Sequence, residues 1–422
     1  MIAMTSTPAD SSVLIVTDQL PYPPRNGITL PVYNYVVGLM KTQPVKVLLL
    51  ADHNSPPSLD ALADNERIFG KIEVVYLSRK GKLPRVLDEL LRREMYNHGW
   101  KRTNQYALPE QMSVDIVLVS PMSAVAKWRS SGLQQIISCS LAIAAIHDCC
   151  TALYYLQARQ SFGGLKLAIK SFQHRLRTYQ IARIEAKLLA PYDHILLQTS
   201  TDLKLMRQLV SVETASHVVL VPNGVSADLF ELTPVSENGT VLFVAELSGE
   251  YAPIADWLVS QLWPEVLKRC PECQLAIVGK GASTTLKAAI QSSTHITYIE
   301  FIEDLSQSYR DAMIVLSPIF KGYGLINKTI EAMAASVPVV GGLAAFNGIE
   351  GFQSGVHGMA CNTRSTTGFA DAIANLVSDP VRRIEMGVAG RRLLQHQFRW
   401  EFAIDKLQQL MRLPNNATHN SH

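Results

Sequence analysis

Short apolar runs rich in β-branched residues alternate with stretches of helical pattern along nearly the whole chain of 422 residues. Several of these runs are apolar without a break, which is typical of strands covered on both faces. Strands that alternate with helices form parallel, doubly wound sheets. The pattern therefore predicts an α/β fold, and the length predicts two domains rather than one core. The strand candidates are Val13–Thr17, Val45–Leu50, Ile72–Leu77, Ile116–Val119, Ile143–Ile146, Ile195–Gln198, Val218–Val221, Val241–Val244, Leu275–Val278, Ile296–Ile299, Ile314–Leu316 and Val337–Val340.

Turn signals concentrate between residues 205 and 240, where Pro222-Asn223-Gly224 and Thr233–Gly239 interrupt the pattern. We place the domain boundary in this region. Open parallel sheets bind ligands at the carboxyl ends of their strands, so we expect the two domains to face each other across a cleft. The predicted organisation is a disordered tail (1–11), a first domain (12–215), a second domain (216–396), a helix that packs back on the first domain (397–413) and a second disordered tail (414–422).

The composition gives no reason to expect a nucleic-acid partner, because 39 Lys and Arg against 36 Asp and Glu leave a net charge of only +3. The six cysteines are few and irregularly spaced, which favours a reducing compartment. The N-terminus lacks the pattern of a signal peptide, and no apolar run is long enough to span a bilayer. We therefore expect a cytoplasmic protein.

Residues 317–342 combine a strand, a glycine loop, a helix and a second strand. Glycines in the loop 322–324 let the backbone approach a phosphate, and the helix that follows offers free N–H groups and the positive end of its dipole. Glu331 lies four residues after Asn327, the expected N-cap. A carboxylate there can accept hydrogen bonds from two neighbouring sugar hydroxyls, so the segment could bind a nucleotide diphosphate. The alternative is an ordinary amphipathic helix whose polar face, with Lys328, points into water.

Further blocks of sequence follow one another in a fixed order. They are Pro21–Gly27, Tyr192–Asp202, Val221–Phe230, Val241–Leu247, Trp263-Pro264, Leu275–Gly281, Phe301–Leu305, Glu331–Ala334 and Pro338–Val340. This ordered set resembles the GT-B glycosyltransferases of the large retaining family 4 group. The resemblance implies two Rossmann-like domains and a nucleotide-sugar donor such as a UDP- or GDP-sugar. It also implies transfer with retained anomeric configuration, with no metal and no cofactor.

The resemblance also assigns roles to individual residues. Glu331 would hold the ribose hydroxyls, Lys328 would place positive charge beside the leaving phosphate, and Gly27 would approach the donor from the first domain. His147 and Asp148 end a first-domain strand, where they could handle a proton of the acceptor or stabilise charge on the sugar, or only cap the next helix. A histidine with a near-neutral pKa suits proton handling. The implied catalytic residues are His147, Asp148 and Lys328, and the implied donor-binding residues are Glu331, Gly322, Tyr323, Gly324, Leu325, Ile326, Asn327, Lys328, Gly27 and Lys280.

Two positions depart from the family pattern. Tyr323 stands where many relatives carry a first glutamate, and Glu246 stands where many carry an arginine that binds the diphosphate. Lys280, Lys321 or Lys328 could supply the missing positive charge. Two alternatives to a transferase therefore stay open. One is a nucleotide-sugar epimerase of the same architecture, and the other is a non-catalytic nucleotide-sugar-binding protein.

The acceptor is not specified by the sequence, and a growing polysaccharide or a lipid-linked saccharide would both suit the resemblance. Two stretches, Arg79–Arg102 and Gly163–Lys187, are basic, and the second carries apolar residues such as Leu176 and Tyr179 at helical spacing. A basic amphipathic helix can lie on an anionic membrane, so peripheral contact at the inner membrane face is one expectation. The other is an ordinary helix with its apolar face in the core.

Overall fold

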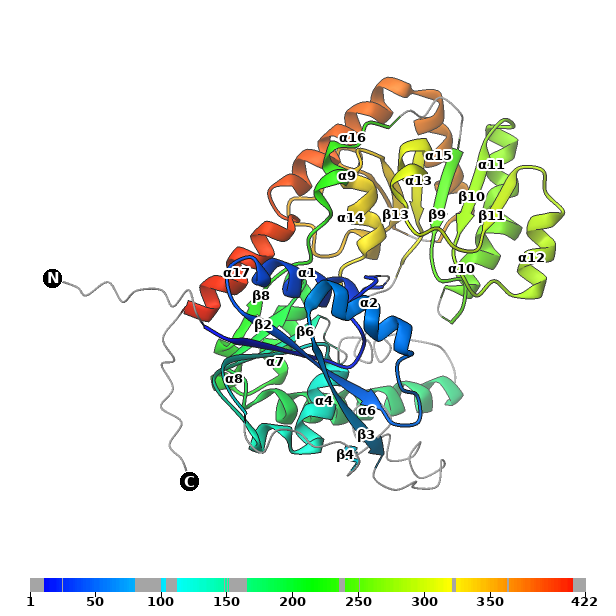
Figure 1. Cartoon of the computed structure of the whole chain (residues 1–422). Coiled ribbons are helices and arrows are strands. Elements are labelled where there is room, and N and C mark those ends of the chain that lie inside the picture. The colour runs from blue at the N-terminus through cyan, green and yellow to red at the C-terminus, as the bar shows by residue number, and fades with distance from the viewer. Residues whose placement is uncertain are drawn as a thin grey trace. The chain divides into compact units, whose positions relative to one another are not determined.

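The structure is a computed structural model, and its described residues fall into two compact units (Figure 1). Unit 1 combines the chain up to Pro222 with the chain from Trp400 onward, and unit 2 spans Asn223–Arg399. Of residues 165–174 only the backbone is described. The described residues are 11–24, 26–79, 100–103, 112–147, 149, 151, 165–234, 240–249, 251–320, 324–362 and 364–412.

Unit 1 is built on a sheet of eight strands in the order β4-β3-β2-β1-β5-β6-β7-β8. Neighbouring strands are parallel, except that β4 pairs antiparallel with β3. The strands are β1 (Val13–Thr17), β2 (Val45–Asp52), β3 (Ile72–Arg79), β4 (Trp100–Arg102), β5 (Met112–Val119), β6 (Ile137–His147), β7 (His194–Leu197) and β8 (Val218–Leu220). The helices are α1 (Thr29–Met40), α2 (Leu59–Phe69), α4 (Met122–Ser131), η1 (Leu133–Gln135), α6 (Leu165–Leu189), α7 (Ser200–Leu209), α8 (Val212–Ser216) and α17 (Trp400–Arg412).

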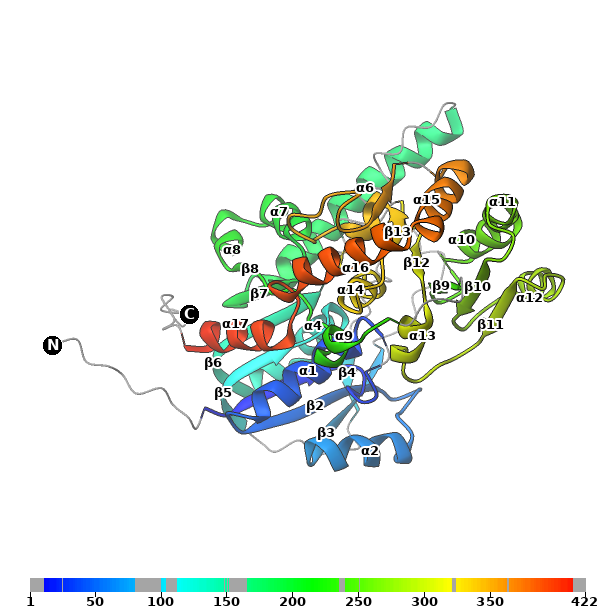
Figure 2. The ribbon, with the colours of Figure 1, turned by 90° about the horizontal axis from the view of Figure 1, so that it is seen from above.

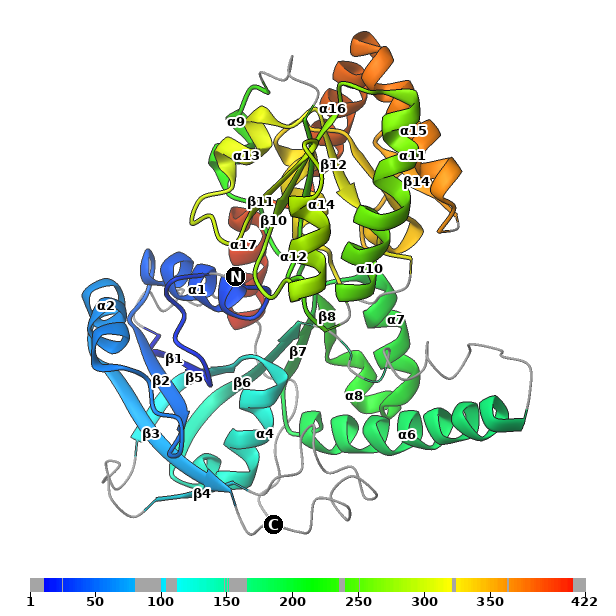
Figure 3. The ribbon, with the colours of Figure 1, turned by 90° about the vertical axis from the view of Figure 1, so that its right-hand side faces the viewer.

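Helix α17 packs against α1, although it follows the whole of unit 2 in the sequence (Figure 1). The ring of Trp400 meets that of Tyr35 edge-on, with centroids 6.3 Å apart. At Gly38 the two helices come so close that a Cβ atom there would lie 2.5 Å from Cγ1 of Ile404. Ile404 and Leu407 belong to the same buried cluster as the side chains of β1 and β2. The last helix is therefore part of the core of unit 1. Figure 3 shows α6 as one long helix of the same unit.

Unit 2 is built on six parallel strands in the order β11-β10-β9-β12-β13-β14. The strands are β9 (Thr240–Val244), β10 (Gln274–Val278), β11 (Ile296–Ile299), β12 (Ile314–Ser317), β13 (Val339–Gly342) and β14 (Met359–Cys361). The helices are α9 (Ala227–Glu231), α10 (Ala252–Trp257), η2 (Leu258–Leu262), α11 (Trp263–Arg269), α12 (Thr284–Gln291), α13 (Ser306–Asp311), α14 (Asn327–Ala334), η3 (Leu343–Phe346), α15 (Thr366–Ser378) and α16 (Pro380–Gln395).

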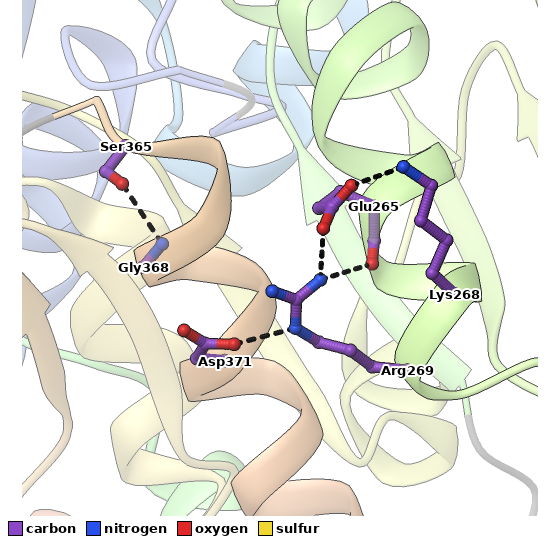
Figure 4. Close-up of polar contacts among 6 residues, drawn as sticks. All are labelled: Glu265, Lys268, Arg269, Ser365, Gly368 and Asp371. Atoms are coloured by element: carbon purple, nitrogen blue, oxygen red, sulfur yellow. Dashed lines mark hydrogen bonds and ion pairs between the residues drawn. The ribbon is translucent and has the colours of Figure 1, made fainter.

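Each face of the second sheet carries its own core, because successive side chains of a strand point to opposite faces. Val241 and Phe243 pack with α11 and α15, whereas Leu242 packs with α14 and the end of α16. Figure 2 shows α14 and α16 side by side. On the first face Arg269 of α11 binds Glu265 at 2.5 Å and Asp371 of α15 at 2.7 Å, and so ties the two helices together (Figure 4).

The α/β class with doubly wound, largely parallel sheets is confirmed. The short strands β4 and β14 were not predicted, and β6 begins at Ile137, six residues before its predicted start at Ile143. The first residues of β6 are mostly exposed, so their sequence is not an apolar run. Strand β8 (Val218–Leu220) pairs with β7, and unit 1 extends to Pro222, whereas the predicted second domain begins at residue 216.

Candidate functional site

Helix α14 begins beside the carboxyl end of β12, and the hydroxyls of two buried residues hold it there. Ser317 Oγ, at the end of β12, lies 2.9 Å from Thr329 Oγ1 in the first turn of the helix. The N-cap is Ile326 rather than the predicted Asn327, and no side chain caps the helix. The first amides of a helix carry unsatisfied N–H groups and the positive end of the dipole. This end of α14 is therefore suited to an anion such as a diphosphate.

Glu331 lies one turn into α14, and its side chain is only 16% exposed. Its Oε2 atom accepts a hydrogen bond from the Tyr309 hydroxyl at 2.8 Å and forms an ion pair with Lys328 Nζ, also at 2.8 Å. Among the described residues, no group bonds to Oε1. The carboxylate is thus fixed through one oxygen, which leaves the other for hydroxyls of a ligand. It is not the solvated surface acid of an ordinary amphipathic helix.

Tyr309 of α13 is fully buried, and burial together with the negative charge of Glu331 raises its pKa well above the ordinary value. The phenol therefore stays protonated and acts only as a donor to Oε2. Lys328 is more open, with 39% of its side chain exposed. The ammonium group can thus bind Glu331 and still face a phosphate near the start of the helix.

The loops after β9 and β10 lie against each other at the carboxyl edge of the same sheet. The amide of Leu247 donates to the carbonyl of Lys280 at 2.6 Å. The Lys280 ammonium lies over the ring of Phe301, 4.2 Å from its centroid, and not in an ion pair with any described residue. Glu246 is exposed, and its Oε1 accepts a hydrogen bond from Ser248 at 3.0 Å. The Glu246 carboxylate therefore has solvent contact that weakens its repulsion of an anion.

His147 ends β6 in unit 1, with a left-handed backbone (φ 66°) and both ring nitrogens engaged. Its Nδ1 lies 2.8 Å from Nε2 of Gln198, and its Nε2 lies 2.8 Å from Oγ of Ser120. Because the amide nitrogen of Gln198 can only donate, the ring proton lies on Nε2 and points to Ser120. Burial lowers the pKa of His147 to about 4, which replaces the near-neutral value expected from the sequence. The ring is a neutral group at pH 7.

We expect the neutral state of His147 to make stability depend on pH. The pKa is about 4 in the folded protein and 6.5 in the unfolded chain, so between these values the unfolded chain binds more protons. The free energy of unfolding should therefore fall by about 3 kcal/mol as the pH drops from 6.5 to 4. Urea unfolding across this range measures the slope. His147→Asn tolerates the left-handed backbone but does not titrate, so it should remove this part of the slope; equal slopes would contradict the assignment.

Several of the predicted site residues are not brought together by the described contacts. Gly27 lies in the exposed loop before α1. The side chain of Asn26 fixes the backbone of this loop, because its Oδ1 accepts hydrogen bonds from the amides of Ile28 and Thr29, both at 2.9 Å. Gly27 and His147 belong to unit 1, whereas Lys280 and the residues 324–331 belong to unit 2. The predicted residues Asp148, Gly322 and Tyr323 lie outside the described residues, as does Lys321.

Four residues that the sequence analysis did not identify hold predicted site residues in place, each within its own unit. Tyr309 fixes Glu331, Ser120 and Gln198 fix His147, and the buried amide of Asn223 donates to Oδ1 of Asn327 at 3.3 Å. A signal for Tyr309 was present in the sequence. Leu305, Tyr309 and Ala312 recur at helical spacing, which predicts that they share one face, and a phenol on a buried face needs a hydrogen-bond acceptor.

Comparison with known proteins gives a family match within unit 2, which contains Glu331. Residues 238–379 match the family model described as Glycosyl transferases group 1. A GDP-mannose-dependent alpha-(1-6)-phosphatidylinositol monomannoside mannosyltransferase of Mycobacterium tuberculosis is 27% identical over 223 residues, which are 47% of this chain and 56% of the relative. A D-inositol 3-phosphate glycosyltransferase of Corynebacterium aurimucosum is 26% identical over 257 residues, 54% of this chain and 58% of the relative. The chain thus spans little more than half the length of these relatives.

Two solved structures are similar over nearly the whole chain. HepE of Anabaena, in complex with UDP and glucose, has a TM-score of 0.64 at 13% identity and covers 95% of this chain and 99% of its own. Sucrose-phosphate synthase of Thermosynechococcus elongatus has a TM-score of 0.64 at 17% identity and covers 95% and 98%. At such identities the likeness concerns the fold. The resemblance predicted from the sequence is confirmed: residues 238–379 of unit 2 match the model of a group 1 glycosyltransferase domain, and the chain has the GT-B fold.

Proposed function

We propose that this protein is a retaining glycosyltransferase that moves a sugar from a UDP- or GDP-sugar to a hydroxyl of a saccharide or a lipid-linked acceptor. The observation that carries the proposal is the Glu331 carboxylate, which is fixed through Oε2 by Tyr309 and Lys328 one turn inside an uncapped helix. Ribose hydroxyls bind its Oε1, and the diphosphate binds the first amides of α14. The loop residues Gly322–Ile326 and the side chains of Lys328 and Lys280 complete this donor site.

In the proposed reaction the bond between the anomeric carbon and the phosphate oxygen breaks, and the acceptor oxygen bonds to that carbon on the same face. The acceptor proton passes to the leaving phosphate oxygen, so no protein base is required. The helix dipole and Lys328 stabilise the charge on the leaving group. No group of three or more His, Cys, Asp or Glu within the described ranges could hold a metal. The proposal assigns the remaining roles, in positioning donor and acceptor, to Gly27, His147 and Asp148 of unit 1.

A lipid-linked acceptor is supported by the first relative above, whose name gives phosphatidylinositol monomannoside as its acceptor. No helix in the described part of the chain has the length and apolar character needed to span a bilayer. Helix α6 exposes half of Leu176 and 61% of Tyr179 beside Arg175 and Arg183. We propose that a cytoplasmic enzyme makes peripheral contact with an anionic membrane through this helix.

A panel of UDP- and GDP-sugars tests the proposal. A donor at about 100 times its Kd stabilises the fold by about 2.7 kcal/mol, which should raise Tm by roughly 5–10 °C. Product analysis with the stabilising donor, with soluble saccharides or with vesicles containing phosphatidylinositol, should then give a glycoside of retained configuration. An isomerised donor formed without acceptor would indicate an epimerase instead. Binding without turnover for every acceptor would indicate a non-catalytic protein.

A further inference from the structure

A second pocket in unit 2, of about 570 Å³, lies at the opposite edge of the sheet from the candidate donor site. Two of its lining residues, Met313 and Pro338, stand directly before β12 and β13 and therefore mark the amino ends of these strands. Ser336 lines it just after the C-terminus of α14, whereas the candidate donor site lies at the N-terminus of that helix. The volume lies within the range of small-molecule sites, and no residue of the pocket belongs to the donor site.

Two guanidinium groups line this pocket without an ion-pair partner among the described residues. Arg383 Nη1 donates to the carbonyls of Leu376 at 2.8 Å and Val377 at 3.2 Å, in the last turn of α15. Arg383 is only 8% exposed, and burial lowers its pKa, an effect that the charge of Asp379 partly opposes. A guanidinium carries five N–H donors, so the carbonyls leave Nε and Nη2 of Arg383 for a ligand.

Arg391 is held in the same manner at the end of α14. Its Nε donates to the carbonyl of Ala334 at 2.8 Å, and its Nη2 donates to the carbonyl of Leu232. Burial lowers the pKa of this group too. Two residues after Ala334, the buried Ser336 Oγ has no hydrogen-bond partner in the described part of the chain. Because this hydroxyl is closed off from solvent, the donors open to a ligand on this side of the pocket are those of Arg391.

The remaining walls of the pocket are apolar, and part of them faces solvent. Ile384 is 64% exposed and Val388 is 37% exposed, both on α16 beside the two arginines. Pro234, Pro338 and Pro380 line other parts of the pocket. These two side chains give the pocket an apolar wall that the hydrocarbon part of a ligand could cover.

We propose that this pocket binds a small amphiphilic anion, an alkyl phosphate ester or an aliphatic carboxylate, with its head on Arg383 and Arg391 and its chain along Ile384 and Val388. The two arginines supply charge-assisted hydrogen bonds that the protein itself leaves unused. The apolar body replaces water on the exposed wall, at a gain proportional to the area it covers.

Binding of hexyl phosphate, hexanoate and inorganic phosphate to the whole protein, by calorimetry and thermal shift, tests the proposal. Hexyl phosphate or hexanoate should bind and raise Tm, and inorganic phosphate should bind at least tenfold more weakly because it has no apolar body. Ile384→Glu places a negative charge on the wall and should weaken binding at least tenfold, whereas Ile384→Lys should retain it. Val381→Glu is the matched control, because Val381 is 66% exposed on the same helix but does not line the pocket.

Four results would overturn the proposal. One is that neither hexyl compound binds. A second is that inorganic phosphate binds as tightly as they do. A third is that Ile384→Glu and Val381→Glu have equal effects. The fourth is that UDP displaces hexyl phosphate, since the probe would then occupy the donor site at the other end of α14.

Discussion

Replacing Glu331 with alanine should lower kcat/KM for the nucleotide-sugar donor by about 100- to 1000-fold. Tyr309 and Lys328 hold the carboxylate in place, and in the proposed site its two charge-assisted hydrogen bonds to the ribose hydroxyls would together be worth about 3–4 kcal/mol. Alanine also leaves the buried hydroxyl of Tyr309 without an acceptor, which costs stability in addition. Initial rates at several donor concentrations measure the effect.

Two further variants separate binding from folding. Glu331→Gln keeps an oxygen that accepts from Tyr309, so it should fold as well as the parent protein and still lose most of the donor affinity. Tyr309→Phe removes one of the two groups that fix the carboxylate and should cost only about 3- to 10-fold in kcat/KM. Glu272→Ala removes an exposed acid from the turn before β10 and should change nothing. Full activity of Glu331→Gln would refute the assignment of the donor site.

Replacing Gly279 with alanine should destabilise unit 2 by at least about 3 kcal/mol. Gly279 follows β10 with a φ of +155°, and a Cβ atom there would overlap the carbonyl oxygen of Ala245, in the loop that follows β9. The obstacle is backbone rather than a flexible side chain, so the paired loops must separate to admit a methyl group. Because these loops bear Lys280 and Glu246, donor affinity should fall along with stability. Urea unfolding and donor-induced thermal shifts measure the two effects.

Gly249 provides the matched control for Gly279. It also has a positive φ, +55°, but a Cβ atom there would have no neighbour within 4 Å. Gly249→Ala should therefore cost only the left-handed backbone strain, about 1 kcal/mol. Equal losses in the free energy of unfolding for the two variants would mean that the close approach of the loops after β9 and β10 does not explain the need for glycine at position 279.

The sequence predicted most of this fold because strands buried on both faces must be apolar throughout. The run Val13–Thr17 was placed at its observed bounds for this reason. Edge strands lack that constraint: β4 has two exposed residues of three, and β14 (Met359–Cys361) is apolar but only three residues long and partly buried. Their pairing is decided by backbone hydrogen bonds with a neighbouring strand that is distant in sequence.

The candidate site was predictable where its chemistry follows from local order, as with Glu331 behind a glycine loop. The residues that hold these side chains in place were not predictable, because they come from other segments of the chain. Tyr309 lies 22 residues from Glu331, and Gln198 lies 51 residues from His147. The roles of the site residues stay predictions. The pKa of His147 was misjudged because burial, which sets it, depends on three neighbouring strands that only the fold brings together.

The position of α17 has a consequence for the synthesis of the protein. A ribosome that has finished Pro222 must add about 190 residues before Arg412 emerges, which takes roughly 10–40 s at ordinary rates of translation. During that interval Tyr35, Gly38 and their neighbours on α1 have no cover from Ile404 and Leu407. The nascent chain thus exposes the apolar face of α1 for many seconds, and we expect a chaperone to bind it at this face.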